Sequence, residues 1–215
     1  MRAATNGSAM ASAAVITAPH LHSVAGMPSA EEKMAIIRHH FGKIMEALGL
    51  DLNDPSLHET PQRVAKMFVK EVFSGLDERN FPAITTFPND YGYGEMLVEK
   101  DIGLYTFCEH HFLPIIGKVH VAYFPGEKVV GLSKLNRLVR YYARRLQVQE
   151  RLTMQIARGM QKVLGTEDVA VYIEADHLCV AARGVEDTKS ATVTNFFGGR
   201  FKESEGRKEF LRSIR

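Results

Sequence analysis

The chain is predicted to form one α+β domain with an antiparallel sheet that carries helices on one face. Its 215 residues are 45% hydrophobic and 24% charged, which is typical of a globular protein with one substantial core. The expected elements follow the order helix, helix, strands, helix, helix, strands, and such segregation favours an α+β arrangement. No stretch approaches the roughly 20 apolar residues of a membrane-spanning helix, so we expect a soluble protein with no membrane partner.

Residues 1–30 are predicted to form a disordered tail. They are rich in Ala, Ser, Thr and Gly, contain no acidic residue and show no apolar periodicity. A transit peptide is the alternative, but the single Arg2 is fewer arginines than such a peptide normally carries.

Two helices are expected in the next region, residues 31–90. Apolar residues of the first recur at three- and four-residue spacing until Gly49: Met34, Ile37, Phe41, Ile44, Met45 and Leu48. In the second, Thr60 is expected to cap the helix and Pro61 suits its first turn. Its buried stripe is expected to end before Gly75: Val64, Met67, Phe68 and Val72.

Residues 91–215 are predicted to form the sheet and two further helices. Short runs of strand formers, broken by Gly103 and Gly117, cover residues 95–102, 105–108 and 118–124, and two later strands cover 169–175 and 191–197. The helices are expected at 133–145 and 149–164, each with a buried apolar stripe. Their inward residues are Leu135, Leu138, Val139 and Tyr142 in the first, and Leu152, Ile156, Met160, Val163 and Leu164 in the second.

Two clusters of metal-ligand residues lie at the ends of predicted strands. Cys108, His110 and His111 follow one strand, and His177 and Cys179 follow another. Strand alternation places His177 and Cys179 on the same side, so the two strand ends can face one spot. Zinc prefers thiolate and imidazole donors, and three protein ligands leave a position for a water whose pKa falls to about 7.

The residues alone leave more than one kind of site open. A closed structural zinc site that uses one further histidine is compatible with the same spacing. The only two cysteines, Cys108 and Cys179, exclude a disulfide framework and fit a reducing, cytoplasmic compartment. The net charge of +2 is too small to imply a polyanion-binding surface over the whole molecule. The other histidines are interpreted as surface or core residues: His20, His22, His39, His40, His58 and His120.

Three segments closely resemble GTP cyclohydrolase I. They read CEHH from residue 108, GLSKLNRLVRYYARRLQVQERLT from residue 131 and HLCVAARG from residue 177, in order and at compatible separations. The resemblance covers nearly everything after about residue 30. It implies the tunnelling fold, a four-stranded antiparallel sheet backed by two helices, which assembles into a toroidal homo-oligomer. In this family two five-membered rings stack into a homodecamer, with active sites between subunits.

The resemblance also implies a reaction, the hydrolysis of GTP to 7,8-dihydroneopterin triphosphate and formate at the start of pterin and tetrahydrofolate synthesis. By position, Cys108, His111 and Cys179 match the ligands of one zinc ion per subunit. His110 and His177 match two catalytic histidines. His177 is expected to protonate N7 of guanine during ring opening, and His110 to handle protons around the ribose.

Substrate contacts are carried over in the same way. Glu150 matches a carboxylate that accepts hydrogen bonds from N1 and the 2-amino group of guanine, an edge that adenine lacks. Gln149 is expected to help through its backbone. Residues that match contacts to the triphosphate are Ser133, Lys134, Arg137, Arg183 and Arg63. Without the resemblance, these cations would be interpreted as solvated helix residues.

Some positions depart from the family pattern. Leu146 stands where many relatives place proline, and Ala181 and Ala182 stand where others carry larger residues. None of these is a proposed ligand, so the departures concern local loop shape.

Two alternatives remain. One is a sister enzyme of the same fold acting on a related purine or pterin, such as a nitrile reductase that uses a nucleophilic cysteine without zinc. The other is a structural-zinc protein that binds nucleic acid through a basic helix. That helix would present Lys134, Arg137, Arg140, Arg144 and Arg145. Glu150 nearby and the small net charge favour GTP as the partner over nucleic acid.

Overall fold

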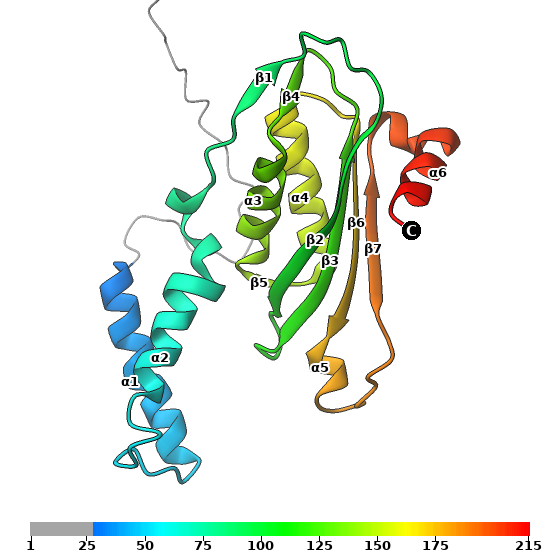
Figure 1. The fold of residues 1–215 in the computed structure, drawn as a ribbon. Coiled ribbons are helices and arrows are strands. Elements are labelled where there is room, and N and C mark those ends of the chain that lie inside the picture. Colours follow the sequence, from blue (N-terminus) through cyan, green and yellow to red (C-terminus); the bar gives the residue numbers. More distant parts are fainter. Residues whose placement is uncertain (1–27) are drawn as a thin grey trace, which may run out of the picture.

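The computed structural model describes residues 28–215 and confirms the α+β class. The expected tail over residues 1–30 lies outside this part of the chain except for residues 28–30. A sheet stands between two helices on one side and a C-terminal helix on the other, and an N-terminal helical hairpin projects away from it (Figure 1). Among the described residues, no helix has the length and apolar character needed to span a bilayer.

The main sheet has five strands in the order β5-β2-β3-β6-β7. Its four long strands are antiparallel neighbours, as expected: β2 (Leu97–Cys108), β3 (Pro114–Tyr123), β6 (Val169–His177) and β7 (Thr192–Phe197). The fifth strand, β5 (Leu146–Gln147), is short and pairs parallel with the end of β2. A separate small sheet pairs β1 (Thr86–Pro88) with β4 (Lys128–Val130).

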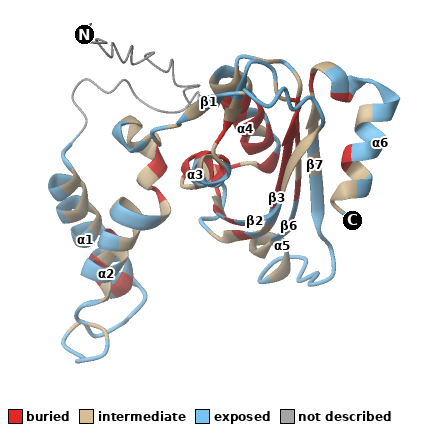
Figure 2. Ribbon diagram, turned by 45° about the horizontal axis from the view of Figure 1, so that its top comes forward, coloured by how far each residue is buried: buried red, intermediate tan, exposed pale blue. Residues whose placement is uncertain are grey.

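Two helices cover one face of the sheet and build the main core. They are α3 (Leu132–Ala143) and α4 (Gln149–Leu164), and the bounds of α4 are those expected from the sequence. Alternate strand residues, such as Val119 and Val121 of β3 and Val171 of β6, pack in this core with the helix stripes. The buried residues concentrate where α3 and α4 meet the sheet (Figure 2).

The opposite face of the sheet is covered near one end by the C-terminal segment. The 3-10 turn η4 (Gly199–Lys202) and α6 (Ser204–Ser213) place Phe201 and Phe210 against Ala122 and Ala170. The helices therefore do not all lie on one face. The two layers explain why β3 and β6 carry apolar residues at successive positions.

The N-terminal region forms a helical hairpin of α1 (Ala30–Ala47) and α2 (Thr60–Lys66). Ser29 and Glu32 form a capping box at the start of α1. The expected cap at Thr60 is wrong, because the helix follows Glu59 and no side chain caps it. After Lys66 the helix continues as the π-helix η1 (Met67–Val72), so helical backbone extends through Val72 as expected. Two 3-10 turns follow, η2 (Ser74–Leu76) and η3 (Glu78–Asn80).

The predicted strand breaks at Gly103 and Gly117 are wrong, because both residues lie inside continuous strands. At Gly117 the reason is close packing between strands. A Cβ atom there would lie 2.1 Å from the carbonyl oxygen of Glu174 and 2.6 Å from the Cβ of Ala175. Glycine at this position permits the approach of β6 and does not mark a turn.

Candidate active site

The metal-ligand residues gather at one end of the sheet because three neighbouring strands end or begin there. Cys108 is the last residue of β2 and His177 is the last residue of β6. Between them β3 begins at Pro114, whose neighbour Ile115 is paired with His177. The strand register therefore brings Cys108 and His177, which are almost 70 positions apart in the chain, to the same end of the sheet.

A tight loop after β2 directs His111 back toward the sheet end. The backbone N–H of Cys108 donates to Leu113 at 2.8 Å, and that of Phe112 donates to the Cys108 carbonyl at 3.0 Å. Phe112 has a φ of 54°, a left-handed conformation that is uncommon for a bulky residue. Such conformations persist where the surrounding structure imposes them, and here two main-chain bonds close the loop.

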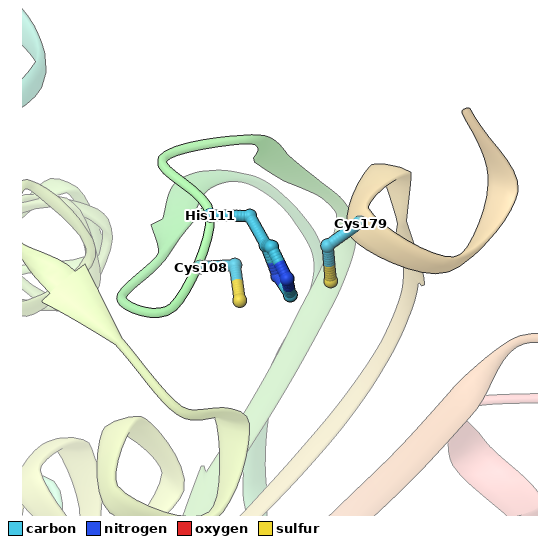
Figure 3. A group of neighbouring side chains, drawn as sticks. All are labelled: Cys108, His111 and Cys179. Atoms are coloured by element: carbon cyan, nitrogen blue, oxygen red, sulfur yellow. The ribbon is translucent and has the colours of Figure 1, made fainter. Parts of the chain in front are cut away.

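Three donor groups converge at this point. The ligand atoms of Cys108, His111 and Cys179 all lie within 4.8 Å of one another. Their side chains point toward a common space: Cys108 from the end of β2, His111 from the loop that follows and Cys179 from α5 (Leu178–Ala181) (Figure 3). The expectation that strand alternation positions Cys179 is wrong. β6 ends at His177, and Cys179 lies on the short helix that follows.

This donor set fits a zinc ion. Two thiols and one imidazole are ligands that zinc prefers, and three protein ligands leave a coordination position open. Burial and the neighbouring Cys108 thiol raise the pKa of Cys179. A cation between the two sulfurs would reverse this preference, because a coordinating thiol is deprotonated. Metal binding and proton release are therefore coupled at this centre.

His110 and Arg183 flank the donor group. The Nδ1 atom of His110 lies 3.7 Å from the Cys108 sulfur, while its ring is largely exposed. The guanidinium of Arg183 donates from Nη1 to Nε2 of His111 at 3.3 Å. One imidazole and one cation are thus available beside the three donors.

His177 lies between the centre and the first turn of α4. Its Nε2 atom is 2.7 Å from Oε1 of Gln149, a residue that is only 1% exposed. Burial lowers the pKa of His177, while the charges of Glu150 and Asp176 partly oppose that effect. Glu150, the expected guanine-reading carboxylate, is the next residue after Gln149 in the first turn of α4.

An ion-pair network that the sequence did not predict fastens the loop. Arg151 donates to Glu109 at 2.5 Å, to the side chain of Gln147 at 3.0 Å and to the carbonyl of Leu146 at 2.9 Å. The backbone N–H of Glu109 also donates to the carbonyl of Gln147. The only signal in the sequence was the carboxylate of Glu109 between Cys108 and His110, and nothing there identified Arg151 as its partner.

The other expected substrate residues do not converge on the centre within one chain. Ser133 and Arg137 line a pocket of about 530 Å³ that also includes Asp101 of β2. The pocket follows β2 from Glu99 to Tyr105, three residues before Cys108, and none of the three donors lines it. Lys134 follows Ser133 in the first turn of α3. Arg63 lies on α2 of the helical hairpin.

The arrangement defines a class of protein. Two thiols and an imidazole at one end of the sheet can bind a metal with an open position, and two further imidazoles beside them can transfer protons. Groups of this kind are typical of a hydrolase.

Comparisons with known proteins identify the particular family. The family model of GTP cyclohydrolase I matches residues 37–215. GTP cyclohydrolase 1 of Flavobacterium johnsoniae is 57% identical over 185 residues, which cover 86% of this chain and 83% of that protein. The enzymes of Enterobacter sp. (strain 638) and Edwardsiella ictaluri are each 54% identical, covering 86% and 88% of this chain and 84% and 87% of their own lengths.

The chain belongs to the GTP cyclohydrolase I family, as the resemblance implied, and it is a hydrolase of that class. Among solved structures, a dihydroneopterin aldolase from Burkholderia thailendensis bound to guanine matches 49% of this chain and 90% of its own. The identity is 17% and the TM-score 0.33, too low to support a conclusion.

Proposed function

We propose that one zinc ion, held by Cys108, His111 and Cys179, serves the GTP cyclohydrolase reaction in this chain. The observation that carries the proposal is the approach of the three ligand atoms to within 4.8 Å of one another. A zinc ion bound there would supply a Lewis acid that activates water near neutral pH. The products are 7,8-dihydroneopterin triphosphate and formate, and the reaction is the first step of pterin and tetrahydrofolate synthesis.

His177 and His110 are the proposed proton-transfer groups. His177 donates a proton to N7 of guanine, so that negative charge does not accumulate on the base as its five-membered ring opens. His177 is half-buried, and burial lowers its pKa, which makes its protonated ring a stronger proton donor toward N7. His110 is exposed beside the donors and serves the protons of the ribose.

Guanine and triphosphate are assigned to two sets of residues. Glu150, exposed in the first turn of α4, accepts hydrogen bonds from N1 and the 2-amino group of guanine, and the backbone of Gln149 assists. The triphosphate is assigned to a hydroxyl and four cations: Ser133, Lys134, Arg137, Arg183 and Arg63. Of these, Arg183 already lies at the centre through its contact with His111.

We also propose that each active site is shared between subunits of a toroidal decamer with the tunnelling fold. The pocket lined by Ser133 and Arg137 includes none of the three metal donors within one chain, so a second copy is the proposed source of donors beside these cations. In the described residues, β7 is an edge strand and β2 is covered at only its last two residues by β5. Such free edges can pair with other copies and close a ring.

Residues 91–215 would then form the catalytic domain and residues 31–90 a supporting helical region. A cytoplasmic location is inferred from the two cysteines, both free thiols in the structure. The nucleic-acid alternative loses support, because Arg145 is 1% exposed and its guanidinium lies over the rings of Tyr141 and Tyr142.

The proposal is tested by incubating the purified protein with GTP while its zinc content is measured. We expect formate, a dihydropterin product that becomes fluorescent after oxidation, and one zinc per chain. Turnover in a metal-free preparation, or zinc without any product, would contradict the proposal. Mass measurement of the native assembly tests the decamer independently.

A further inference from the structure

The side chain of Gln149 is held in one orientation by its surroundings. Its Nε2 group donates to the carbonyl of Thr192 at 2.9 Å, to the hydroxyl of Thr194 at 3.1 Å and to the carbonyl of Ile173 at 3.3 Å. Two of these acceptors are main-chain carbonyls, which cannot donate. An amide turned the other way would place its own oxygen against them, so the nitrogen must face β6 and the segment at the start of β7.

This orientation decides which atom of Gln149 meets His177. With Nε2 directed to the carbonyls, Oε1 is the atom at 2.7 Å from Nε2 of His177. An amide oxygen only accepts, so the imidazole nitrogen must carry the hydrogen. In a neutral imidazole the other nitrogen, Nδ1, is then the acceptor. Within residues 28–215, no protein group forms a hydrogen bond with Nδ1 of His177.

We propose that Gln149 is a positioning residue that holds His177 as its Nε2–H tautomer and leaves Nδ1 as the atom that exchanges the proton with substrate. This inference rests on the proposed role of His177. It adds to the backbone contact already assigned to Gln149 a separate role for its side chain. Nε2 keeps its hydrogen throughout, so one ring nitrogen is anchored while the other gives and takes the proton.

The structure explains why a glutamine is required for this task. The amide joins the middle of β6, through Ile173, to the start of β7, through Thr192, and to the first turn of α4, on which it lies. Because the side chain is only 1% exposed, water cannot replace these bonds easily. A methionine of similar length would fill the space but offer His177 only a weak sulfur acceptor, so the ring would lose the bond that fixes its tautomer.

The kinetic test compares Gln149→Met with Gln155→Met. Gln155 lies on the same helix and is also 1% exposed, but its Oε1 atom accepts from Gln147 and makes no contact with His177. In Gln149→Met we expect kcat to fall about 10- to 100-fold, since general acid catalysis depends on placement of the proton donor. KM for GTP should stay within about threefold, and zinc content should not change. Gln155→Met should retain kcat within about twofold.

Three kinetic results would overturn the inference. A raised KM with unchanged kcat would mean that the side chain of Gln149 binds substrate. Unchanged kinetics would mean that it does not position His177, and an equal fall in kcat in Gln155→Met would mean that both substitutions act through packing. A wild-type protein without turnover would instead contradict the proposed function, and the measurement below is independent of turnover.

The tautomer can be measured directly in the unsubstituted zinc-loaded protein. Solid-state ¹⁵N spectra of histidine-labelled enzyme, recorded about 2 pH units above the ordinary histidine pKa, distinguish protonated from unprotonated ring nitrogens. The signals of His177 among the nine histidines are identified by subtracting the spectrum of His177→Ala. A proton on Nε2 supports the inference, and a proton on Nδ1 overturns it, whether or not Gln149→Met folds.

Discussion

Arg151 is expected to control how firmly the loop after β2 holds the metal. The Glu109 carboxylate lies between Cys108 and His110, and Arg151 fixes it from the first turns of α4. Replacing Arg151 by methionine keeps most of the aliphatic stem but removes all three donated hydrogen bonds. The loop would then have only its main-chain bonds to keep His111 directed toward the two cysteines.

The size of the effect follows from the three bonds. The charge-assisted bond to Glu109 is worth about 1.5–3 kcal/mol, and each bond to a neutral oxygen about 0.5–1.5 kcal/mol. The side chains of Arg151 and Glu109 are 16% and 25% exposed, so water replaces part of what is lost. We expect the free energy of unfolding to fall by about 2–3 kcal/mol. If about 1.4 kcal/mol of this falls on the metal-bound loop, zinc binds tenfold more weakly.

Both quantities can be measured. Zinc affinity is obtained by competition with a chromophoric chelator, and the free energy of unfolding by urea titration at a fixed protein concentration, because assembly affects stability. Arg158→Met is the matched control, since Arg158 is exposed on the same helix and its change should stay within about 0.5 kcal/mol. Unchanged zinc affinity and stability in Arg151→Met would show that the ion pair does not hold the loop.

Three further predictions concern the centre and the sheet. Cys179→Ala should lose zinc and activity together, whereas His177→Ala should retain zinc and lose ring opening; release of the metal from His177→Ala would mean that ligand and acid are confused. Glu150→Ala should weaken GTP binding about 10-fold or more with zinc retained, as measured by titration calorimetry, because a charged hydrogen-bond acceptor is lost. His120 accepts a hydrogen bond from the backbone N–H of Asp101. Burial lowers the pKa of His120 below its value in the unfolded chain, which is about 6.5. The folded state therefore binds fewer protons in that range, so the free energy of unfolding should fall as pH drops through about 6, and His120→Gln should weaken this dependence in urea titrations. An identical pH dependence in that variant would assign the effect to another group.

Much of the fold could be predicted because apolar periodicity reports burial directly. Leu152, Ile156 and Met160 recur along one face of α4, and all three are buried in the main core. The same logic failed at Gly117, because a glycine that permits two strands to approach has the same sequence appearance as one that ends a strand. The distinction depends on Glu174 and Ala175, which are distant in the chain.

The candidate site could likewise be predicted only in part from the sequence. The pairing of rare cysteines with histidines was enough to predict a metal centre, since those residue types have few other reasons to occur together. The short helix that carries Cys179 was not predictable, because it depends on where β6 loses its neighbour. The roles of Gln149, Arg145 and Arg151 were also hidden. Polar residues are usually exposed, and only the folded chain shows that Gln149 and Arg145 are buried and that Arg151 is paired.

The separation of the metal donors from the cations of α3 has a genetic consequence under the proposed assembly. Each chain would contribute its two cysteines to one active site and Arg137 to another, so selection acts on the interface between two copies. Two inactive variants, one without Cys179 and one without Arg137, would then form some complete active sites when their chains assemble in one oligomer. Recovery of activity on co-expression, with none from either variant alone, would make that dependence visible.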